Sequence, residues 1–383
     1  MLRVLQERES TRRHARSVSR PESARGRYSY RRSTLPHLDR DVLSFYSVSV
    51  GSHPSQSHRN RYLEVEPYNR TRVVVRFDEN EMCVQSAETA EGWYLNASWV
   101  LERFGGKWWI ATQAPLPGTA HAFLSLILQT KTRPSKPIGS LPAGRVRTVV
   151  QLTQNVEDGF RKADTYFPSI VGQSRIVYPE KEHTSSALKV TLLHKKHIEE
   201  AKCVQSTVSV VPISLAPKAE VETDDYGGET DEGIYGEKDG SPITFRHLLF
   251  YAWPDHGVPR QEDRACLLNF IRLVDKVNRD APDPDLDPDP PIIVGCSAGI
   301  GRTGSFIVLC SLLRAHGFLP PPCSPTPASA LPTTPLGPLP SELQEDLAVQ
   351  EIDSLRDQRP GMVQRPEQVL LVYDVLKTAF TSR

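Results

Sequence analysis

Runs of β-branched and aromatic residues recur after position 60, and longer stretches place apolar residues at helical spacing. The predicted strands are 73–77, 93–100, 108–112, 146–152, 188–193, 203–211 and 292–295. The predicted helices are 120–130, 262–278, 303–316, 341–358 and 366–378. Ser341 followed by Gln344 is a capping-box pattern that predicts a helix start at 341. Because most strands precede the helices, we expect an α/β (α+β) fold, a twisted mixed sheet flanked by helices.

Two kinds of segment depart from this pattern. Four stretches are rich in Pro, Gly, Ser, Thr or acidic residues and lack the apolar residues that would offset ordering entropy. We expect them to be mobile, low-complexity surface inserts within one domain that runs from 41 to 383. They are residues 133–145, 216–243, 281–291 and 317–340. Residues 1–40 hold ten arginines before position 33 against three glutamates, which predicts a basic disordered tail. A mitochondrial transit peptide is the alternative, and the three glutamates oppose it.

Composition narrows the class of protein. The chain has 46 basic and 46 acidic side chains, which argues against a globally basic nucleic-acid binder. Of its 32 prolines, 14 lie in the two short windows 281–291 and 320–340. Six cysteines form no Cys-x-x-Cys pair, which indicates a reducing compartment and no metal cluster. The longest apolar run, 306–313, is far shorter than the roughly 20 residues that span a bilayer. We expect a cytoplasmic monomer, with the nucleus as a second location, and neither membrane nor nucleic-acid partners.

Residues 292–306 run from a predicted strand through a glycine-rich turn into a helix. Gly299, Gly301 and Gly304 satisfy the dinucleotide pattern G-x-G-x-x-G, but no acidic residue follows about 20 positions later to bind a ribose. A nucleotide P-loop also fits poorly, because 295–303 is one residue too long and has Arg302 in place of Lys. The third interpretation, Cys-x5-Arg, uses every residue.

In that interpretation Cys296 is a nucleophile and Arg302 clamps a phosphate. The intervening backbone N–H groups form a nest at a helix N-terminus, which binds a tetrahedral dianion; they belong to Ser297, Ala298, Gly299, Ile300 and Gly301. Arg302 adds two parallel donors that match phosphate geometry. The same positive field favours the thiolate form of Cys296.

These residues, Cys-Ser-Ala-Gly-Ile-Gly-Arg-Thr-Gly, resemble the signature of the protein tyrosine phosphatase family, and further family motifs follow in order between about 58 and 376. The resemblance implies a cysteine-phosphatase fold, a catalytic domain over 41–383, and phosphotyrosine proteins as substrates. It implies no metal and no cofactor. Thr303, at the start of the helix, would support the thiolate with its hydroxyl.

The motif Trp253-Pro254-Asp255-His256-Gly257-Val258-Pro259 is similar to the family's mobile acid loop. Asp255 would protonate the leaving tyrosyl oxygen and later take a proton from water. Trp253 beside the rigid Pro254 suits a loop that closes as a unit over the substrate.

The motif Asn60-Arg61-Tyr62 resembles the family's substrate-recognition loop. Tyr62 would form an aromatic wall that deepens the pocket, so a phosphoserine would not reach the cysteine. Glu64 stands where many members have an aspartate that binds the substrate backbone. The deep pocket favours a phosphotyrosine-specific enzyme over a dual-specificity phosphatase.

Residues 361–368 resemble the family's glutamine loop, in which Gln364 would orient the hydrolytic water and Gln368 would assist. Scaffold motifs of the family match 94–98, 109–115 and 154–168. Within the last of these, Glu157 would pin Arg302 with a paired carboxylate. Lys162 would lie near the acid loop.

One residue departs from the family pattern. Most members place His before the catalytic Cys, and this chain has Gly295. We expect Cys296 to form its thiolate less readily, not an inactive enzyme. An inactive phosphotyrosine-binding module is the alternative from another class, but such chains usually lose the Cys, the acid or the Arg. The proline-rich inserts are similar to those of fungal enzymes that act on mitogen-activated kinases, which makes such kinases candidate substrates by analogy.

Overall fold

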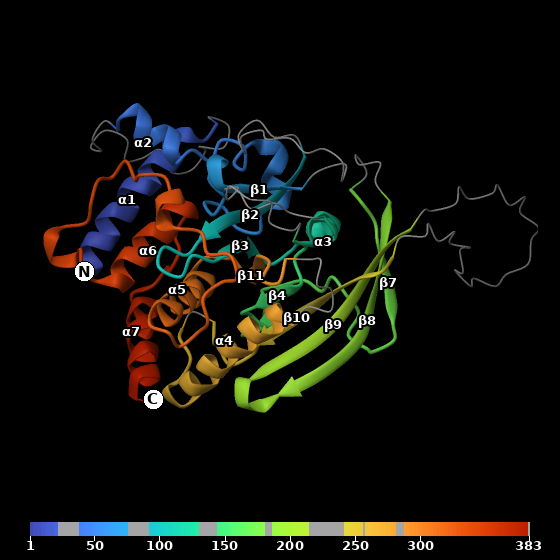
Figure 1. Cartoon of the computed structure of the whole chain (residues 1–383). Helices are drawn as coiled ribbons and strands as arrows, with labels where there is room; N and C mark the ends of the chain where they lie inside the picture. Colours follow the sequence, from blue (N-terminus) through green and yellow to red (C-terminus); the bar gives the residue numbers. More distant parts are fainter. Residues whose placement is uncertain are drawn as a thin grey trace, which may run out of the picture.

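A nine-stranded mixed sheet forms the centre of the molecule in the computed structural model (Figure 1). The structure describes residues 1–21, 38–75, 92–129, 144–180, 186–213, 241–255, 257–280 and 287–381. The strand order is β1-β2-β3-β11-β4-β10-β9-β8-β7. The strands are β1 Arg72–Val75, β2 Trp93–Leu101, β3 Trp108–Gln113, β4 Thr148–Gln151, β7 Ser174–Val177, β8 Ala187–Ile198, β9 Cys203–Ile213, β10 Ile243–Phe250 and β11 Ile292–Cys296. This sheet confirms the predicted α/β fold; β7 and β10 were not predicted.

Strand β11 lies in the middle of the sheet, parallel to β3 on one side and to β4 on the other. All five of its residues are buried. A parallel strand covered on both faces reads as a continuous apolar run, which is how Ile292, Ile293 and Val294 appear in the sequence. The strand therefore delivers its last residue, Cys296, to the centre of one sheet edge.

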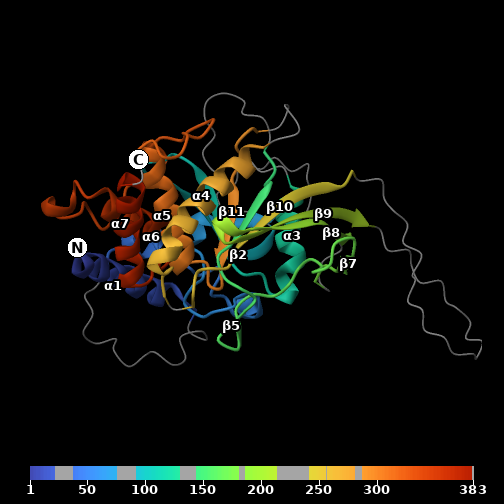
Figure 2. The ribbon, with the colours of Figure 1, turned by 90° about the horizontal axis from the view of Figure 1, so that it is seen from below.

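Helices cover both faces of the sheet (Figures 1 and 2). They are α1 Leu2–Ser19, α2 Arg40–Phe45, α3 Ala120–Leu128, α4 Arg264–Arg279, α5 Gly301–Ala315, α6 Leu347–Gln358 and α7 Pro366–Thr381. Helices α4 to α7 share one hydrophobic core with Ile292 and Val294, whereas α3 shares a second core with Ile293. The alternation along β11 thus directs neighbouring side chains into opposite layers.

Helix α6 begins later than the capping-box pattern predicts. Residues Ser341–Leu343 form a single 3-10 turn, and α6 starts at Leu347. The N-cap is Asp346, whose Oδ1 accepts hydrogen bonds of 3.1 Å from the backbone N–H groups of Ala348 and Val349. An aspartate that caps two free N–H groups outcompetes the Ser341 start.

The prediction of a disordered tail was wrong for residues 2–19, which form helix α1. Leu5 and Ala15 on one face of α1 are buried, and so is Arg12. The helix forms because partners from the far end of the chain, Asp353 and Asp357, neutralise Arg12. Residues 22–37 of the predicted tail lie outside the described residues.

The prediction of a mobile insert was also wrong for residues 317–340, hereafter the proline-rich strap. The backbone N–H of Thr326 donates to the carbonyl of Gly106 at 2.9 Å. The Thr326 hydroxyl accepts a hydrogen bond of 2.9 Å from the Trp108 indole N–H. Arg279 donates to the carbonyls of Pro320 and Pro321. Prolines supply carbonyl acceptors without competing N–H donors, so side chains can hold such a segment without a core of its own. Residues 133–143, 216–240 and 281–286 of the other inserts lie outside the described residues.

Candidate active site

Residues 296–302 form a tight loop between β11 and α5, hereafter the phosphate loop. The backbone N–H of Gly299 points at the Cys296 Sγ atom, 3.3 Å away. Gly299 has φ +70°, and a Cβ there would lie 2.1 Å from the carbonyl oxygen of Thr112. Only glycine fits this approach of the loop to β3, and the approach turns the amide toward the sulfur.

Arg302 is oriented by a two-point pair with Glu157. Its Nη1 and Nη2 atoms donate to the two carboxylate oxygens, each at 2.7 Å, and Nη1 also donates to the Leu152 carbonyl at 2.9 Å. Burial opposes the charge, but the bond to Glu157 and the nearby Cys296 sulfur raise the pKa of Arg302 above its usual value. The hairpin of β5 (Val156–Glu157) and β6 (Phe160–Arg161) carries Glu157 into this position.

Asp255 faces the phosphate loop and touches two cations. Its Oδ1 atom accepts from Arg302 Nη2 at 2.8 Å, and its Oδ2 atom lies 2.5 Å from Lys162 Nζ. The hydrogen bond from Lys162 to Asp255 raises the pKa of that lysine. Trp253 is buried and donates its indole N–H to the Gly257 carbonyl at 3.2 Å, which braces the loop that carries Asp255.

Tyr62 lies against the phosphate loop through its hydroxyl group. Its hydroxyl is 2.7 Å from Ser297 Oγ, which in turn donates to the Lys162 carbonyl at 2.7 Å. The loop of Tyr62 is held by Gln113, whose Oε1 atom accepts from the Arg61 N–H at 2.9 Å. Glu64, in the same loop, is exposed and has φ +67°.

The glutamine loop reaches the phosphate loop through Gln368, which is 4% exposed and packs against Gly301. Gln364 has an exposed side chain and follows Val363, whose φ is +53°. The hydroxyl of Thr303 is buried and has no hydrogen-bond partner in the described part of the chain.

Two buried arginines of the site were missed by sequence reasoning. Arg359 donates to the carbonyls of Gly299 and Ala298, at 2.7 and 3.1 Å, and so fixes the back of the phosphate loop. Burial lowers the pKa of Arg359 to about 10. Arg356 donates to carbonyls of the glutamine loop. The one available signal is their position at the C-terminal end of α6, just before that loop.

The glycine at 295 has a structural reason. A Cβ on Gly295 would lie 2.7 Å from the Thr112 carbonyl oxygen of the neighbouring strand. A histidine there would require β3 and β11 to move apart. A Gly295→His variant would therefore change the spacing of the two strands as well as the environment of Cys296.

The described residues contain neither a candidate membrane-spanning helix nor a candidate metal site. No described helix combines the length and apolar character needed to cross a bilayer. No group of three or more His, Cys, Asp or Glu side chains in the described ranges is arranged to hold a metal ion.

Comparison with known proteins agrees with the geometry. The protein-tyrosine phosphatase family model matches residues 56–316. Non-receptor type 2 tyrosine-protein phosphatase of Rattus norvegicus is 28% identical over 332 residues, 86% of this chain and 57% of that protein. Tyrosine-protein phosphatase 2 of Schizosaccharomyces pombe is 27% identical over 323 residues, which are 84% of this chain and 34% of that protein. The human phosphatidylinositol phosphatase PTPRQ is 29% identical over 290 residues, which are 75% of this chain and 9% of that protein.

The chain spans between about a tenth and just over half of the length of these relatives. The family model, in contrast, covers well over half of the chain itself and includes the phosphate loop and the acid loop. The chain therefore belongs to the protein-tyrosine phosphatase family.

Proposed function

We propose that the protein hydrolyses phosphotyrosine in proteins through a phosphocysteine on Cys296. The observation that carries the proposal is the convergence on Arg302, which Glu157 orients at 2.7 Å and which Asp255 contacts at 2.8 Å beside the sulfur-bearing loop. An oriented guanidinium, a nest of amides and a carboxylate in one site fit attack on a phosphate ester.

In the first step the Cys296 thiolate attacks phosphorus and the bond from phosphorus to the tyrosyl oxygen breaks. Asp255 gives its proton to that oxygen, so tyrosine leaves neutral. A bound phosphate would take the Arg302 donors that Asp255 uses in the free enzyme. This exchange frees the carboxyl group to turn to the leaving oxygen.

In the second step a water oxygen attacks phosphorus and the sulfur–phosphorus bond breaks. Asp255 takes the proton of the water, and Gln364 holds the water with an amide that does not titrate. The products are inorganic phosphate and the Cys296 thiolate. Thr303 supports this thiolate, because its buried hydroxyl is not engaged elsewhere among the described residues.

Tyr62 supports the preference for phosphotyrosine. Its hydroxyl lies 2.7 Å from Ser297 Oγ, so the aromatic side chain reaches the phosphate loop and suits a wall beside it. A short phosphoserine side chain would not reach past such a wall. Glu64 is exposed beside it and suits contact with the substrate backbone.

The test is hydrolysis of a phosphotyrosine peptide beside its phosphoserine twin and a phosphoinositide, with Cys296→Ser as the inactive control. We expect release from phosphotyrosine alone. Equal release from both peptides indicates a dual-specificity enzyme, and preference for the phosphoinositide indicates a lipid phosphatase like the human relative named above. Binding of the phosphotyrosine peptide without turnover indicates an inactive binding module. A tyrosine-phosphorylated mitogen-activated kinase is a suitable first protein substrate.

A further inference from the structure

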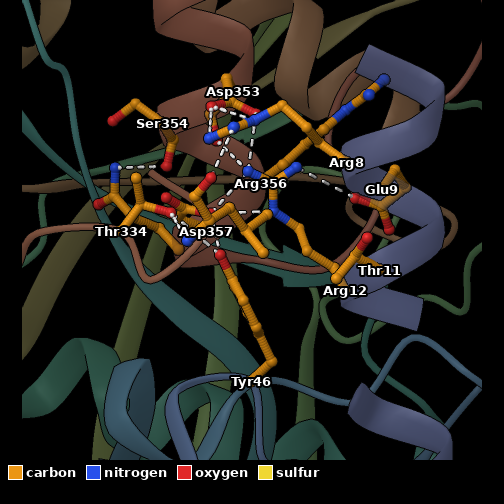
Figure 3. Close-up of polar contacts among 12 residues, drawn as sticks. Arg8, Glu9, Thr11, Arg12, Tyr46, Thr334, Asp353, Ser354, Arg356 and Asp357 are labelled. Atoms are coloured by element: carbon orange, nitrogen blue, oxygen red, sulfur yellow. Dashed lines mark hydrogen bonds and ion pairs between the residues drawn. The ribbon is translucent and has the colours of Figure 1, made fainter. Parts of the chain in front are cut away.

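Helix α1 docks on α6 through ion pairs between buried charged side chains (Figure 3). The Arg12 side chain is 0% exposed and donates to Asp353 at 2.7 Å and to Asp357 at 2.7 and 2.9 Å. Tyr46 donates its hydroxyl to Asp357 at 2.6 Å, and Arg8 donates to both oxygens of Asp353 at 3.0 Å. One arginine of α1 thus holds two neighbouring turns of α6.

Arg356 lies between those two aspartates in α6 and connects α1 with the glutamine loop. Its Nη1 atom donates to the Leu5 carbonyl of α1 at 2.9 Å. Its Nε and Nη2 atoms donate to the carbonyls of Met362 and Val363 at 2.9 and 2.8 Å. The side chain is 6% exposed, so these carbonyls and α1 enclose it.

The backbone of the glutamine loop is strained at Val363, the residue that directly precedes Gln364. Val363 has φ +53°, a left-handed conformation that is unfavourable for a β-branched residue. Such a conformation persists only where surrounding contacts enforce it. Two contacts do so: the bond from Arg356 to its carbonyl, and a 3.3 Å bond from its N–H to the Ile300 carbonyl of the phosphate loop.

We propose that Arg356 is a positioning residue for Gln364 and that α1, docked through Arg12, keeps Arg356 in place. The inference rests on the proposed phosphatase function. The docked helix then controls the second step, in which water attacks the phosphocysteine. The first step is insulated, because Arg302 and Asp255 take their contacts from Glu157 and Lys162 and not from α1.

The test compares Arg12→Glu with Arg13→Glu, which makes the same charge change on the exposed face of α1. Both full-length variants and the natural chain are mixed rapidly with p-nitrophenyl phosphate. For Arg12→Glu we expect kcat to fall roughly ten- to a hundredfold with a parallel fall in KM, so that kcat/KM stays within about twofold. We also expect an initial burst that approaches one molecule of p-nitrophenol per active site, which indicates that the phosphocysteine accumulates. Arg13→Glu behaves like the natural chain.

Arg356→Lys is the second variant, and it decides the question if Arg12→Glu does not fold. Lysine keeps the charge but loses the planar fork that reaches two carbonyls, so the same accumulation of phosphocysteine is expected. Combining either variant with Gln364→Ala adds little further loss in kcat, because both act through that side chain.

Two results overturn the inference. In one, trypsin cleaves α1 of Arg12→Glu faster while its kcat remains that of Arg13→Glu. In the other, kcat and kcat/KM fall together, as in a general loss of structure. Failure of the proposed function looks different: the natural chain releases no phosphate from phosphotyrosine, or Gln364→Ala leaves the hydrolysis of the phosphocysteine unchanged.

Discussion

Arg302 donates four hydrogen bonds in the candidate site, and its partners divide into two kinds. Glu157 and the Leu152 carbonyl hold the guanidinium from the scaffold side, whereas Asp255 contacts it from a loop. We expect the scaffold contacts to persist when substrate binds, whereas a bound phosphate would compete with Asp255 for the guanidinium group. The pair with Glu157 therefore sets the orientation of the guanidinium group. The pair with Asp255 is expected only in the absence of substrate.

Replacing Glu157 by Gln keeps the shape of the side chain but turns one accepting oxygen into a donor that faces Arg302. We expect kcat/KM for a phosphotyrosine peptide to fall roughly a hundredfold, as when an oriented donor to a transition state is lost. Steady-state kinetics measures the effect. The matched control is Asp158→Asn, the next residue on the same hairpin, which is exposed and should stay near the natural value. Equal activity of the two variants contradicts the role of Glu157.

Alanine substitutions at Gly299 and Gly317 distinguish the effect of backbone strain from that of steric clash. Both have φ near +70°, but a Cβ at Gly317 meets no atom within 4 Å, whereas one at Gly299 meets the Thr112 carbonyl. We expect Gly317→Ala to lower the free energy of unfolding by about 1–2 kcal/mol and to keep activity. Gly299→Ala should lower it further and abolish activity. Denaturant unfolding and peptide hydrolysis measure the two effects, and an active Gly299→Ala enzyme would refute the close approach.

Among the elements, the proline-rich strap differs most from what its composition suggests. It is attached at separate points by side chains of other elements, among them Trp108 and Arg279. Arg8 of α1 adds bonds to the carbonyls of Leu336 and Gly337, at 3.2 and 2.9 Å. The strap therefore joins α1, α4 and the β2–β3 turn on one side of the molecule.

Thr326→Val tests whether the strap is docked. The substitution keeps the shape but removes the acceptor of the buried Trp108 N–H, so we expect the free energy of unfolding to fall by about 1–3 kcal/mol. Catalysis should not change, because the strap makes no contact with the phosphate loop in the described structure. The control is Thr333→Val at an exposed position of the same strap. Indistinguishable unfolding of the two variants would restore the mobile-loop interpretation.

Sequence reasoning succeeds where the signal is local and fails where it comes from a distant partner. Apolar runs locate β11 and α5, and the spacing from Cys296 to Arg302 locates the phosphate loop. The start of α6 is missed because Asp346 competes with Ser341 as a cap. Helix α1 is missed because its buried face carries charges whose partners come more than 300 residues later. Arg359 is missed because its partners, two carbonyls of the phosphate loop and the side chains of Asn96 and Ser98, lie far from it in the sequence.

At the scale of the whole molecule, a buried carboxyl group couples stability to pH. Glu351 is 0% exposed and accepts bonds from the N–H groups of Arg103 and Phe104, at 3.0 and 3.2 Å, and from the Ser311 hydroxyl at 2.7 Å. Burial raises its pKa from 4.5 to about 7. The folded protein thus retains this proton in a range where the unfolded chain has released it.

Since the folded state binds more protons between these two values, stability falls as the pH rises from about 4.5 to about 7. The loss attributable to Glu351 is up to about 3 kcal/mol. We expect Glu351→Gln to remove this part of the slope, which urea unfolding at a series of pH values measures. A slope as steep in the variant as in the natural chain would show that other groups cause it.

The pairing of Arg12 with Asp357 joins positions 345 residues apart in the chain. During synthesis on the ribosome, α1 emerges more than 300 residues before its acceptors on α6. Contacts of such sequence separation form late, because a very long loop must close before they contribute. Until then the buried arginines of the α1 segment lack their carboxylate partners, so the nascent chain exposes a basic segment that the folded protein buries.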